Sequence, residues 1–178
     1  MEPDPDGATG ATARPLVVTL CTGNAARSVM AGAMLVSAPV EIVTAGTHVV
    51  EGQPMSRRTR DALATVELRA DGHRSHQLTG ADVAAADLIV ALAGEHVAYV
   101  RRRHPEAASR TATLKRLVRD LPDGPDPLGE RVARLGLADV VLEPWEDVED
   151  PAGGEDERYV ACARELAGLS AELVTRLR

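Results

Sequence analysis

The sequence contains no phenylalanine, and only 2% of its 178 residues are aromatic, namely one Trp and two Tyr. A folded core must therefore consist of Leu, Val, Ala and Ile, and a binding site lined by several aromatic rings is barely possible. Hydrophobic residues nevertheless reach 44% and charged residues 26%, which allows both a buried core and a charged surface. The length suits one domain, because domains typically hold about 100–200 residues.

Further absences narrow the class of protein. Two cysteines, Cys21 and Cys162, are too few for a disulfide scaffold. No apolar run reaches the ~18 residues of a membrane span, and no basic segment followed by an apolar one indicates a secretory signal. The net charge of −7 argues against a nucleic-acid partner, because such proteins usually carry a basic excess. We therefore expect a cytoplasmic protein with no membrane partner, in a reducing setting where a single cysteine can serve chemistry.

The order of the predicted elements indicates the fold class. Residues 1–14 are rich in Pro, Gly, Ala and acidic residues and predict a disordered tail before one domain at 15–178. Short β-branched or apolar runs predict strands at 16–20, 40–46 and 86–92. Apolar residues at helical spacing predict helices at 26–37, 54–70, 94–104, 128–137 and in the C-terminal segment. Residues 111–121 predict a short strand or bend that continues into a helix, and 122–154 otherwise predict loop.

Strands that alternate with helices indicate βαβ units and a parallel sheet. The sequence thus predicts a single three-layer α/β domain, with a four-stranded parallel sheet, helices on both faces and a phosphate-binding loop after the first strand. In such sheets ligands bind at the carboxyl ends of the strands, near the point where the strand order reverses. The first place to look for a site is therefore the end of the strand at 16–20.

The loop after that strand, residues 21–27, has the composition of an anion-binding loop. Gly23 permits a close approach of the backbone and a positive φ, and Asn24 tolerates the left-handed region better than most residues. Backbone N–H groups that turn inward above a helix N-terminus bind anions. Arg27 adds a planar fork that matches two phosphate oxygens.

Cys21 lies at the start of this loop and is expected to face the same point. A helix N-terminus, several N–H groups and a nearby arginine favour the thiolate, which is the nucleophilic form. A thiolate that faces a bound phosphate displaces the leaving group in line, while Arg27 and the N–H groups hold the other oxygens. Ser28 can donate a hydrogen bond to this thiolate and make it a better leaving group in a second step.

Residues 21–28, CTGNAARS, resemble the signature loop of the low-molecular-weight protein tyrosine phosphatases. Further segments resemble the second strand, the histidine segment, the third strand with its helix, and the Asp-Pro loop of that family. They follow the family's order and are VTAGTH (43–48), DGHRSHQLT (71–79), ADLIVALAGEHVAYV (86–100) and EDPAGGEDERY (149–159). The resemblance therefore spans about residues 16–178.

This resemblance implies a protein phosphatase that needs no metal or other cofactor, hydrolyses phosphotyrosine in a phosphorylated protein and releases inorganic phosphate. Cys21 would form a phosphocysteine intermediate, and Arg27 would bind the phosphate. The rest of the loop would also bind the substrate phosphate, through Thr22, Gly23, Asn24, Ala25, Ala26 and Ser28. The hydrogen-bond network that supports the loop would include Asn24, Ser28, Thr44 and His73, with Thr44 in place of the family's usual serine.

The leaving group needs a proton, and a positioned acid contributes about 10²–10⁴-fold to the rate. Two Asp-Pro pairs compete for this role, Asp126-Pro127 and Asp150-Pro151. Proline fixes the backbone after the aspartate and so helps to hold the carboxylate in place. Only Asp150 directly precedes the C-terminal helix, as in the family, so we expect it to act first as the acid and then as the base for the hydrolytic water. Asp126 is expected to cap or precede a short helix.

The walls of the pocket leave the identity of the leaving group open. The positions that usually offer aromatic walls correspond to Val50, Ala152 and Gly153, so stacking on a phosphotyrosine ring is expected to be weak. The DP-x-GG pattern at 150–154 also resembles the protein arginine phosphatase branch of the family. That branch carries threonine at the position of Ala25, where tyrosine phosphatases carry a larger apolar residue, so Ala25 matches neither. Phosphoarginine hydrolysis is therefore an alternative.

A second alternative is a catalytically weak phosphate-binding module. The intact set of Cys21, Arg27 and Asp150 argues against it, because a binder needs no acid. Ala26 stands where many family members carry a second cysteine, so the expected nucleophile has no vicinal redox partner. Cys162 lies on the apolar stripe of the last helix and is expected in the core.

Overall fold

A parallel sheet of four strands forms the centre of the computed structural model, which describes residues 13–178. The strands are β1 (Leu16–Cys21), β2 (Glu41–Gly46), β3 (Leu88–Ala91) and β4 (Thr111–Thr113). Their order in the sheet is β2-β1-β3-β4, and all three neighbouring pairs are parallel. The predicted four-stranded parallel sheet is confirmed.

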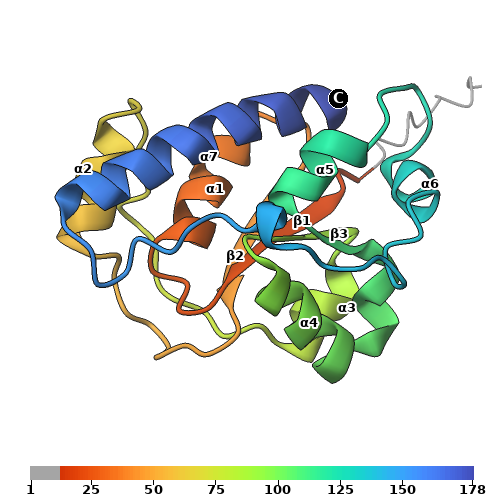
Figure 1. Cartoon of the computed structure of the whole chain (residues 1–178), viewed down its shortest axis with the longest axis horizontal. Coiled ribbons are helices and arrows are strands. Elements are labelled where there is room, and N and C mark those ends of the chain that lie inside the picture. The colour runs from red at the N-terminus through yellow and green to blue at the C-terminus, as the bar shows by residue number, and fades with distance from the viewer. Residues whose placement is uncertain (1–12) are drawn as a thin grey trace, which may run out of the picture.

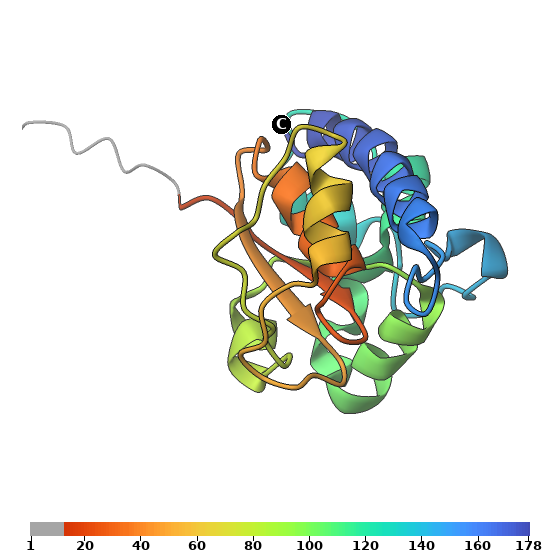
Figure 2. The same cartoon turned by 90° about the vertical axis from the view of Figure 1, so that its left-hand side faces the viewer.

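Helices cover both faces of this sheet (Figure 1, Figure 2). One face carries α1 (Arg27–Leu35), α2 (Arg57–Ala64), α5 (Leu114–Asp120) and α7 (Asp156–Arg176). The other face carries α3 (Gly80–Ala85) and α4 (Gly94–Arg103), followed by the 3-10 helix η1 (Pro105–Arg110). The remaining helices, α6 (Leu128–Ala133) and the 3-10 helix η2 (Pro144–Glu146), belong to the connection between α5 and α7.

The strands bury side chains on both faces, as strands of a covered parallel sheet do. Val17 and Leu88 belong to the core beneath α1, α5 and α7, whereas Val18 and Ile89 belong to the core on the α3 and α4 side. All four side chains are fully buried. This double burial explains why the strands appear in the sequence as continuous apolar runs.

The carboxyl end of β1 is the point where the chain changes direction across the sheet. β1 leads through α1 to the edge strand β2, and the chain then returns to the opposite side of β1 to form β3. Loops that leave neighbouring strands in opposite directions open a crevice at such a point. Cys21, the last residue of β1, lies there and pairs with Gly46 of β2.

Several helices differ from the sequence prediction, among them the helix expected over 128–137, which ends at Ala133. The helix expected over 54–70 ends at Ala64, and Glu67 then turns the chain in a left-handed conformation (φ 59°). The sequence pattern does not predict α3, which begins with a capping box between Thr79 and Asp82.

Residues 1–12 of the predicted tail 1–14 lie outside the residues that the structure describes. Among residues 13–178, no helix combines the length and the apolar character needed to cross a membrane.

Candidate active site

A pocket of about 160 Å³ opens at the carboxyl end of β1. Cys21 and Arg27 line it together with the loop that joins them. The other lining residues come from the start of α2, from the loop before α7 and from the first turn of α7, and are Ser56, Thr59, Asp150, Ala152 and Tyr159. Figure 1 shows the loop before α1 and the loop before α7 approaching each other above this end of the sheet. The pocket therefore lies between segments that are far apart in the sequence.

The loop after β1 presents backbone N–H groups for an anion. Within residues 13–178, the N–H groups from Thr22 to Ala26 donate to no backbone carbonyl. α1 begins directly after them at Arg27, so its first-turn N–H groups face the same end. Of the two loop residues that suit a positive φ, Gly23 and Asn24, Asn24 adopts one, of 50°. Asparagine tolerates this conformation, and its side chain is fixed on both sides.

The buried side chain of Asn24 holds the loop in shape. Its Nδ2 donates to Ser28 Oγ over 2.9 Å, and its Oδ1 accepts from the His76 backbone N–H over 2.8 Å. Its backbone carbonyl accepts from His73 Nε2 over 2.8 Å. Burial lowers the pKa of His73, although the hydrogen bond to Asn24 favours the charged form. Asn24, Ser28 and His73, all predicted from the sequence, thus lie in one network.

His76 connects this network to two carboxylates. Its Nδ1 lies 3.1 Å from Glu51 Oε1, and its Nε2 lies 2.8 Å from Asp82 Oδ2. Burial alone would lower the pKa of His76, but the hydrogen bonds and charges of Glu51 and Asp82 outweigh burial and raise the pKa above 6.5. No local pattern predicts this role of His76, because the role depends on contacts with three separate segments.

Ser28 is placed to stabilise a thiolate on Cys21. The Cys21 sulfur lies 3.0 Å from Ser28 Oγ, and both residues are buried. Because Ser28 Oγ already accepts a hydrogen bond from Asn24 Nδ2, its own proton is free to point at the sulfur. Thr19 Oγ1 donates to the Ser28 backbone carbonyl over 2.8 Å and fixes the residue further.

Additional contacts hold the loop backbone from outside. The Thr47 backbone N–H donates to the Cys21 carbonyl over 2.9 Å, and Thr59 Oγ1 donates to the Ala25 carbonyl over 2.9 Å. Thr44 does not take the supporting role expected of it. It lies on β2 with its γ-methyl group against Gly32 of α1, and within residues 13–178 its hydroxyl makes no hydrogen bond that reaches the loop. Thr59, which the sequence analysis missed, supports the loop instead.

A buried histidine contacts the side of the loop opposite α2. His96 of α4 is 1% exposed, and its Nε2 lies 3.0 Å from Thr22 Oγ1. Burial lowers the pKa of His96 to about 3, and the positive charge of Arg27 acts in the same direction. The ring is therefore neutral at physiological pH and adds no charge to the pocket.

Arg27 joins the loop to the predicted acid. Its Nη2 lies 2.7 Å from Asp150 Oδ2, and its Nη1 donates to the Val148 carbonyl over 3.1 Å. The Arg27 side chain is 4% exposed, whereas that of Asp150 is 46% exposed. Asp150 Oδ1 also accepts from the Ala152 N–H over 3.0 Å, and the Val148 N–H donates to the Leu92 carbonyl of the strand end. The carboxylate is thus fixed at the edge of the pocket with one side open to solvent.

The competing aspartate lies elsewhere. Asp126 Oδ2 is 2.7 Å from Arg134 Nη2, and the residue precedes α6. The expectation that Asp126 precedes a short helix is confirmed. Of the two Asp-Pro pairs, only Asp150 lines the pocket that contains Cys21.

A buried ion pair anchors the segment that leads to Asp150. Glu146 is fully buried and forms hydrogen bonds with the Arg116 guanidinium and with Thr113 Oγ1. Burial raises the pKa of Glu146, but the hydrogen bonds from Arg116 and Thr113 outweigh burial and lower the pKa below its usual value. The charged form of Glu146 therefore fixes the chain four residues before the acid.

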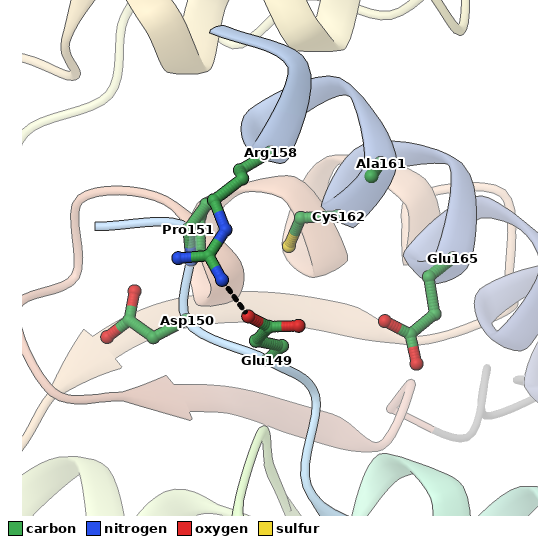
Figure 3. Close-up of a pocket in the computed structure, with 7 residues that line it drawn as sticks. All are labelled: Glu149, Asp150, Pro151, Arg158, Ala161, Cys162 and Glu165. Atoms are coloured by element: carbon green, nitrogen blue, oxygen red, sulfur yellow. Dashed lines mark hydrogen bonds and ion pairs between the residues drawn. The ribbon is translucent and has the colours of Figure 1, made fainter. Parts of the chain in front are cut away.

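A second, smaller cavity of about 100 Å³ lies between the Asp-Pro loop and α7 (Figure 3). Glu149 and Arg158 form an ion pair of 2.6 Å at this cavity, and Cys162 of α7 lines it. Cys162 is 5% exposed and belongs to the main hydrophobic core, as expected. Burial raises the pKa of this thiol to about 12, so it is protonated at neutral pH. Among residues 13–178, no group of three His, Cys, Asp or Glu side chains could hold a metal ion.

The fold and the site define a phosphate-binding α/β protein with a cysteine at the base of its anion-binding loop. Residues 16–141 match the family model described as low molecular weight phosphotyrosine protein phosphatase. The chain belongs to this family and is a phosphatase of it, so phosphorylated proteins are the implied substrates.

The similar proteins include phosphatases with different named substrates. A protein-arginine-phosphatase of Geobacillus stearothermophilus is 31% identical over 165 residues, which are 91% of this chain and 95% of that protein. The probable low molecular weight protein-tyrosine-phosphatase EpsP of Ralstonia solanacearum is 34% identical over 103 residues, 57% of this chain and 69% of that protein. The crystal structure of a low molecular weight protein tyrosine phosphatase from T. tengcongensis superimposes with a TM-score of 0.71 at 29% identity, covering 90% of this chain and 97% of that one.

Proposed function

We propose that this chain hydrolyses phosphotyrosine in proteins through a phosphocysteine intermediate on Cys21. The observation that carries the proposal is the placement of Cys21, Arg27 and Asp150 in one pocket, with Ser28 3.0 Å from the sulfur. A nucleophile, a phosphate-binding cation and an acid are the three groups that this displacement requires.

In the first step the Cys21 thiolate attacks phosphorus, the S–P bond forms and the bond to the tyrosine oxygen breaks. The loop N–H groups and Arg27 hold the three remaining phosphoryl oxygens, on which charge is spread in the transition state. Asp150 gives its proton to the departing oxygen, so tyrosine leaves as the neutral phenol.

The ion pair between Arg27 and Asp150 couples substrate binding to this proton transfer. Without phosphate, the Nη2 group of Arg27 is engaged by Asp150 at 2.7 Å. When a phosphate takes the guanidinium fork, Asp150 loses its cation and gains a neighbouring dianion. The released carboxyl is then available to the leaving-group oxygen.

In the second step Asp150, now a carboxylate, takes a proton from water as the water oxygen attacks phosphorus. The S–P bond breaks, inorganic phosphate leaves and the Cys21 thiolate is restored. The hydrogen bond from Ser28 stabilises this thiolate as it departs. No metal enters either step.

Phosphoarginine is the second candidate substrate. It is favoured by the 31% identity to a protein-arginine-phosphatase over 91% of this chain. The small side chain of Ala25 in the pocket leaves room for either leaving group.

The test compares two peptides of identical sequence that carry phosphotyrosine or phosphoarginine, with a metal chelator present. We expect turnover of the phosphotyrosine peptide, its loss in Cys21→Ser, and a fall in kcat of at least about 10²-fold in Asp150→Asn. Asp126→Asn is a matched control, because Asp126 also precedes proline and pairs with an arginine at 2.7 Å. Cys162→Ser is the control for Cys21→Ser.

Faster turnover of the phosphoarginine peptide would assign the second candidate. Turnover of neither peptide, with phosphate still bound, would refute both enzymatic proposals and favour a phosphate-binding module. An Asp126→Asn variant as impaired as Asp150→Asn would overturn the choice of acid.

A further inference from the structure

The pocket around Cys21 has one aromatic side chain in its wall. Most other lining residues are small: Ala25, Ala26, Ala152, Ser56 and Thr59. Tyr159, from the first turn of α7, lines the same pocket and is partly exposed. The leaving group of a bound substrate extends outward from the phosphate, between these walls, so Tyr159 is the surface of greatest area that it can meet.

The other two aromatic side chains of the chain are engaged elsewhere. Tyr99 packs edge-on against His48, with ring centroids 5.7 Å apart. Trp145 lies beneath the Arg119 guanidinium, 4.2 Å from its ring centroid. Because the sequence contains only one Trp, two Tyr and no Phe, Tyr159 is the single aromatic residue available to the pocket.

An arginine fixes the ring of Tyr159 from one side. The Arg58 guanidinium lies over the ring, 5.9 Å from its centroid. Arg58 is itself held by Asp156, with 2.9 Å between Nε and Oδ1, and by the Gly154 carbonyl. A cation over one face of a ring is attracted by its π electrons. Arg58, which does not line the pocket, therefore restrains the ring and draws electron density toward its own side of the ring.

We propose that Tyr159 determines substrate specificity: its ring is the wall on which an aromatic leaving group packs. This inference rests on the proposed phosphatase activity and names the residue that selects its substrate. The Asp-Pro loop offers only Asp150 and Ala152 to the pocket, so the aromatic surface comes from the helix that follows this loop. A neutral phenyl ring packs favourably on a ring polarised by Arg58, whereas a guanidinium gains less from a face whose electron density is already drawn away. The pair therefore favours phosphotyrosine over phosphoarginine.

The test measures kcat/KM for wild type, Tyr159→Leu and Tyr159→Phe with the paired peptides and with acetyl phosphate, which has no ring. We expect Tyr159→Leu to lower kcat/KM for the phosphotyrosine peptide by about 2–10-fold, mainly through KM, and to leave acetyl phosphate unchanged. Tyr159→Phe should retain the wild-type preference, because the ring remains. Tyr99→Leu, the same change at the other tyrosine, should leave the ratio between substrates unchanged.

A second variant tests the role of Arg58. Arg58→Gln removes the charge but keeps hydrogen-bond donors, and we expect the ratio of phosphoarginine to phosphotyrosine turnover to rise at least 2-fold. Arg58 also holds the Asp-Pro loop, so Arg58→Gln can lower the turnover of both substrates. Such a general loss cancels in the ratio of the two rates. An unchanged or lower ratio would overturn the electronic part of the inference.

Binding of phosphonates separates this inference from the proposed function. We expect Tyr159→Leu to weaken phenylphosphonate binding by about 2–10-fold and methylphosphonate binding not at all, and neither measurement requires turnover. If no peptide is hydrolysed, the proposed function fails, but a selective loss of phenylphosphonate affinity still supports the role of Tyr159 as the aromatic wall. Equal losses for both phosphonates, or no loss, would overturn it.

Discussion

Gly46, the last residue of β2, lies so close to the phosphate-binding loop that a larger side chain must displace it. A Cβ at this position would lie 2.5 Å from the Thr22 carbonyl oxygen and 2.9 Å from the Asn24 backbone nitrogen. Both are backbone atoms, so neither can rotate away. To move from 2.5 Å to the 3.0 Å that a real Cβ requires, the backbone must shift by at least 0.5 Å.

This displacement sets the size of the expected effect for Gly46→Ala. Overpacking of a tight site costs about 1–3 kcal/mol in the free energy of unfolding. A misplacement of about 1 Å can cost roughly 10²-fold in rate, so about half that distance is expected to lower kcat/KM by roughly 10-fold. The free energy of unfolding is measured by urea denaturation, and kcat/KM is measured with a small aryl phosphate as substrate.

Gly168→Ala is the matched control. Gly168 lies inside α7, and a Cβ there would meet no atom within 4 Å. Alanine in a helix interior is more stable than glycine by about 0.5–1 kcal/mol, so this variant should be more stable and equally active. A Gly46→Ala variant with wild-type stability and wild-type kcat/KM would refute the argument that β2 sets the position of the loop.

Three further predictions concern His76, Glu146 and Cys162. Glu51 and Asp82 raise the pKa of His76 in the folded protein. The contribution of His76 to stability is therefore complete below the unfolded pKa of about 6.5 and is lost as pH rises through the higher folded pKa. The difference in unfolding free energy between wild type and His76→Gln should decrease over this pH range. Glu146→Ala leaves the buried Arg116 charge with only its longer contacts to Asp120 (3.4 Å) and Glu143 (3.7 Å). This change should cost about 3–5 kcal/mol by denaturation, whereas replacing both Glu146 and Arg116 by apolar residues should recover most of it. Because the pKa of Cys162 is about 12, native protein treated with iodoacetamide at pH 7.5 should carry the label on Cys21 and not on Cys162, and equal labelling by mass spectrometry would contradict this.

The strands were predictable because burial on both faces leaves a strong local pattern. The prediction of 16–20 differs from β1 by one residue, and both faces of that strand are apolar. α3 left no such pattern, because it has six residues and buries only Val83. The helix expected over 54–70 was too long because its apolar spacing continues past the turn at Glu67.

The candidate site was predictable only where its residues are close in sequence or carry a rare local signal. Cys21 and Arg27 lie six residues apart, and Asp150 stands before proline at the start of the last helix. Thr59 and His96 have no such signal, because each reaches the loop from a different helix and is an ordinary polar residue in its own segment. Gly23 and Asn24 were both compatible with a left-handed backbone, and only the folded loop shows that Asn24 adopts it.

Two arginines explain how a loop with so little apolar surface holds the acid in place. Arg27 binds the Val148 carbonyl and the Asp150 carboxylate at one end of the Asp-Pro loop, and Arg58 binds the Gly154 carbonyl at the other. The two ends differ in what a substrate does to them. In the proposed mechanism phosphate competes for the Arg27 fork and releases the carboxyl for proton transfer, whereas Arg58 keeps its partners and holds the loop beside the pocket. In that mechanism Asp150 therefore stays beside the leaving group while it transfers its proton, because the arginine that binds phosphate and the arginine that holds the loop are different residues.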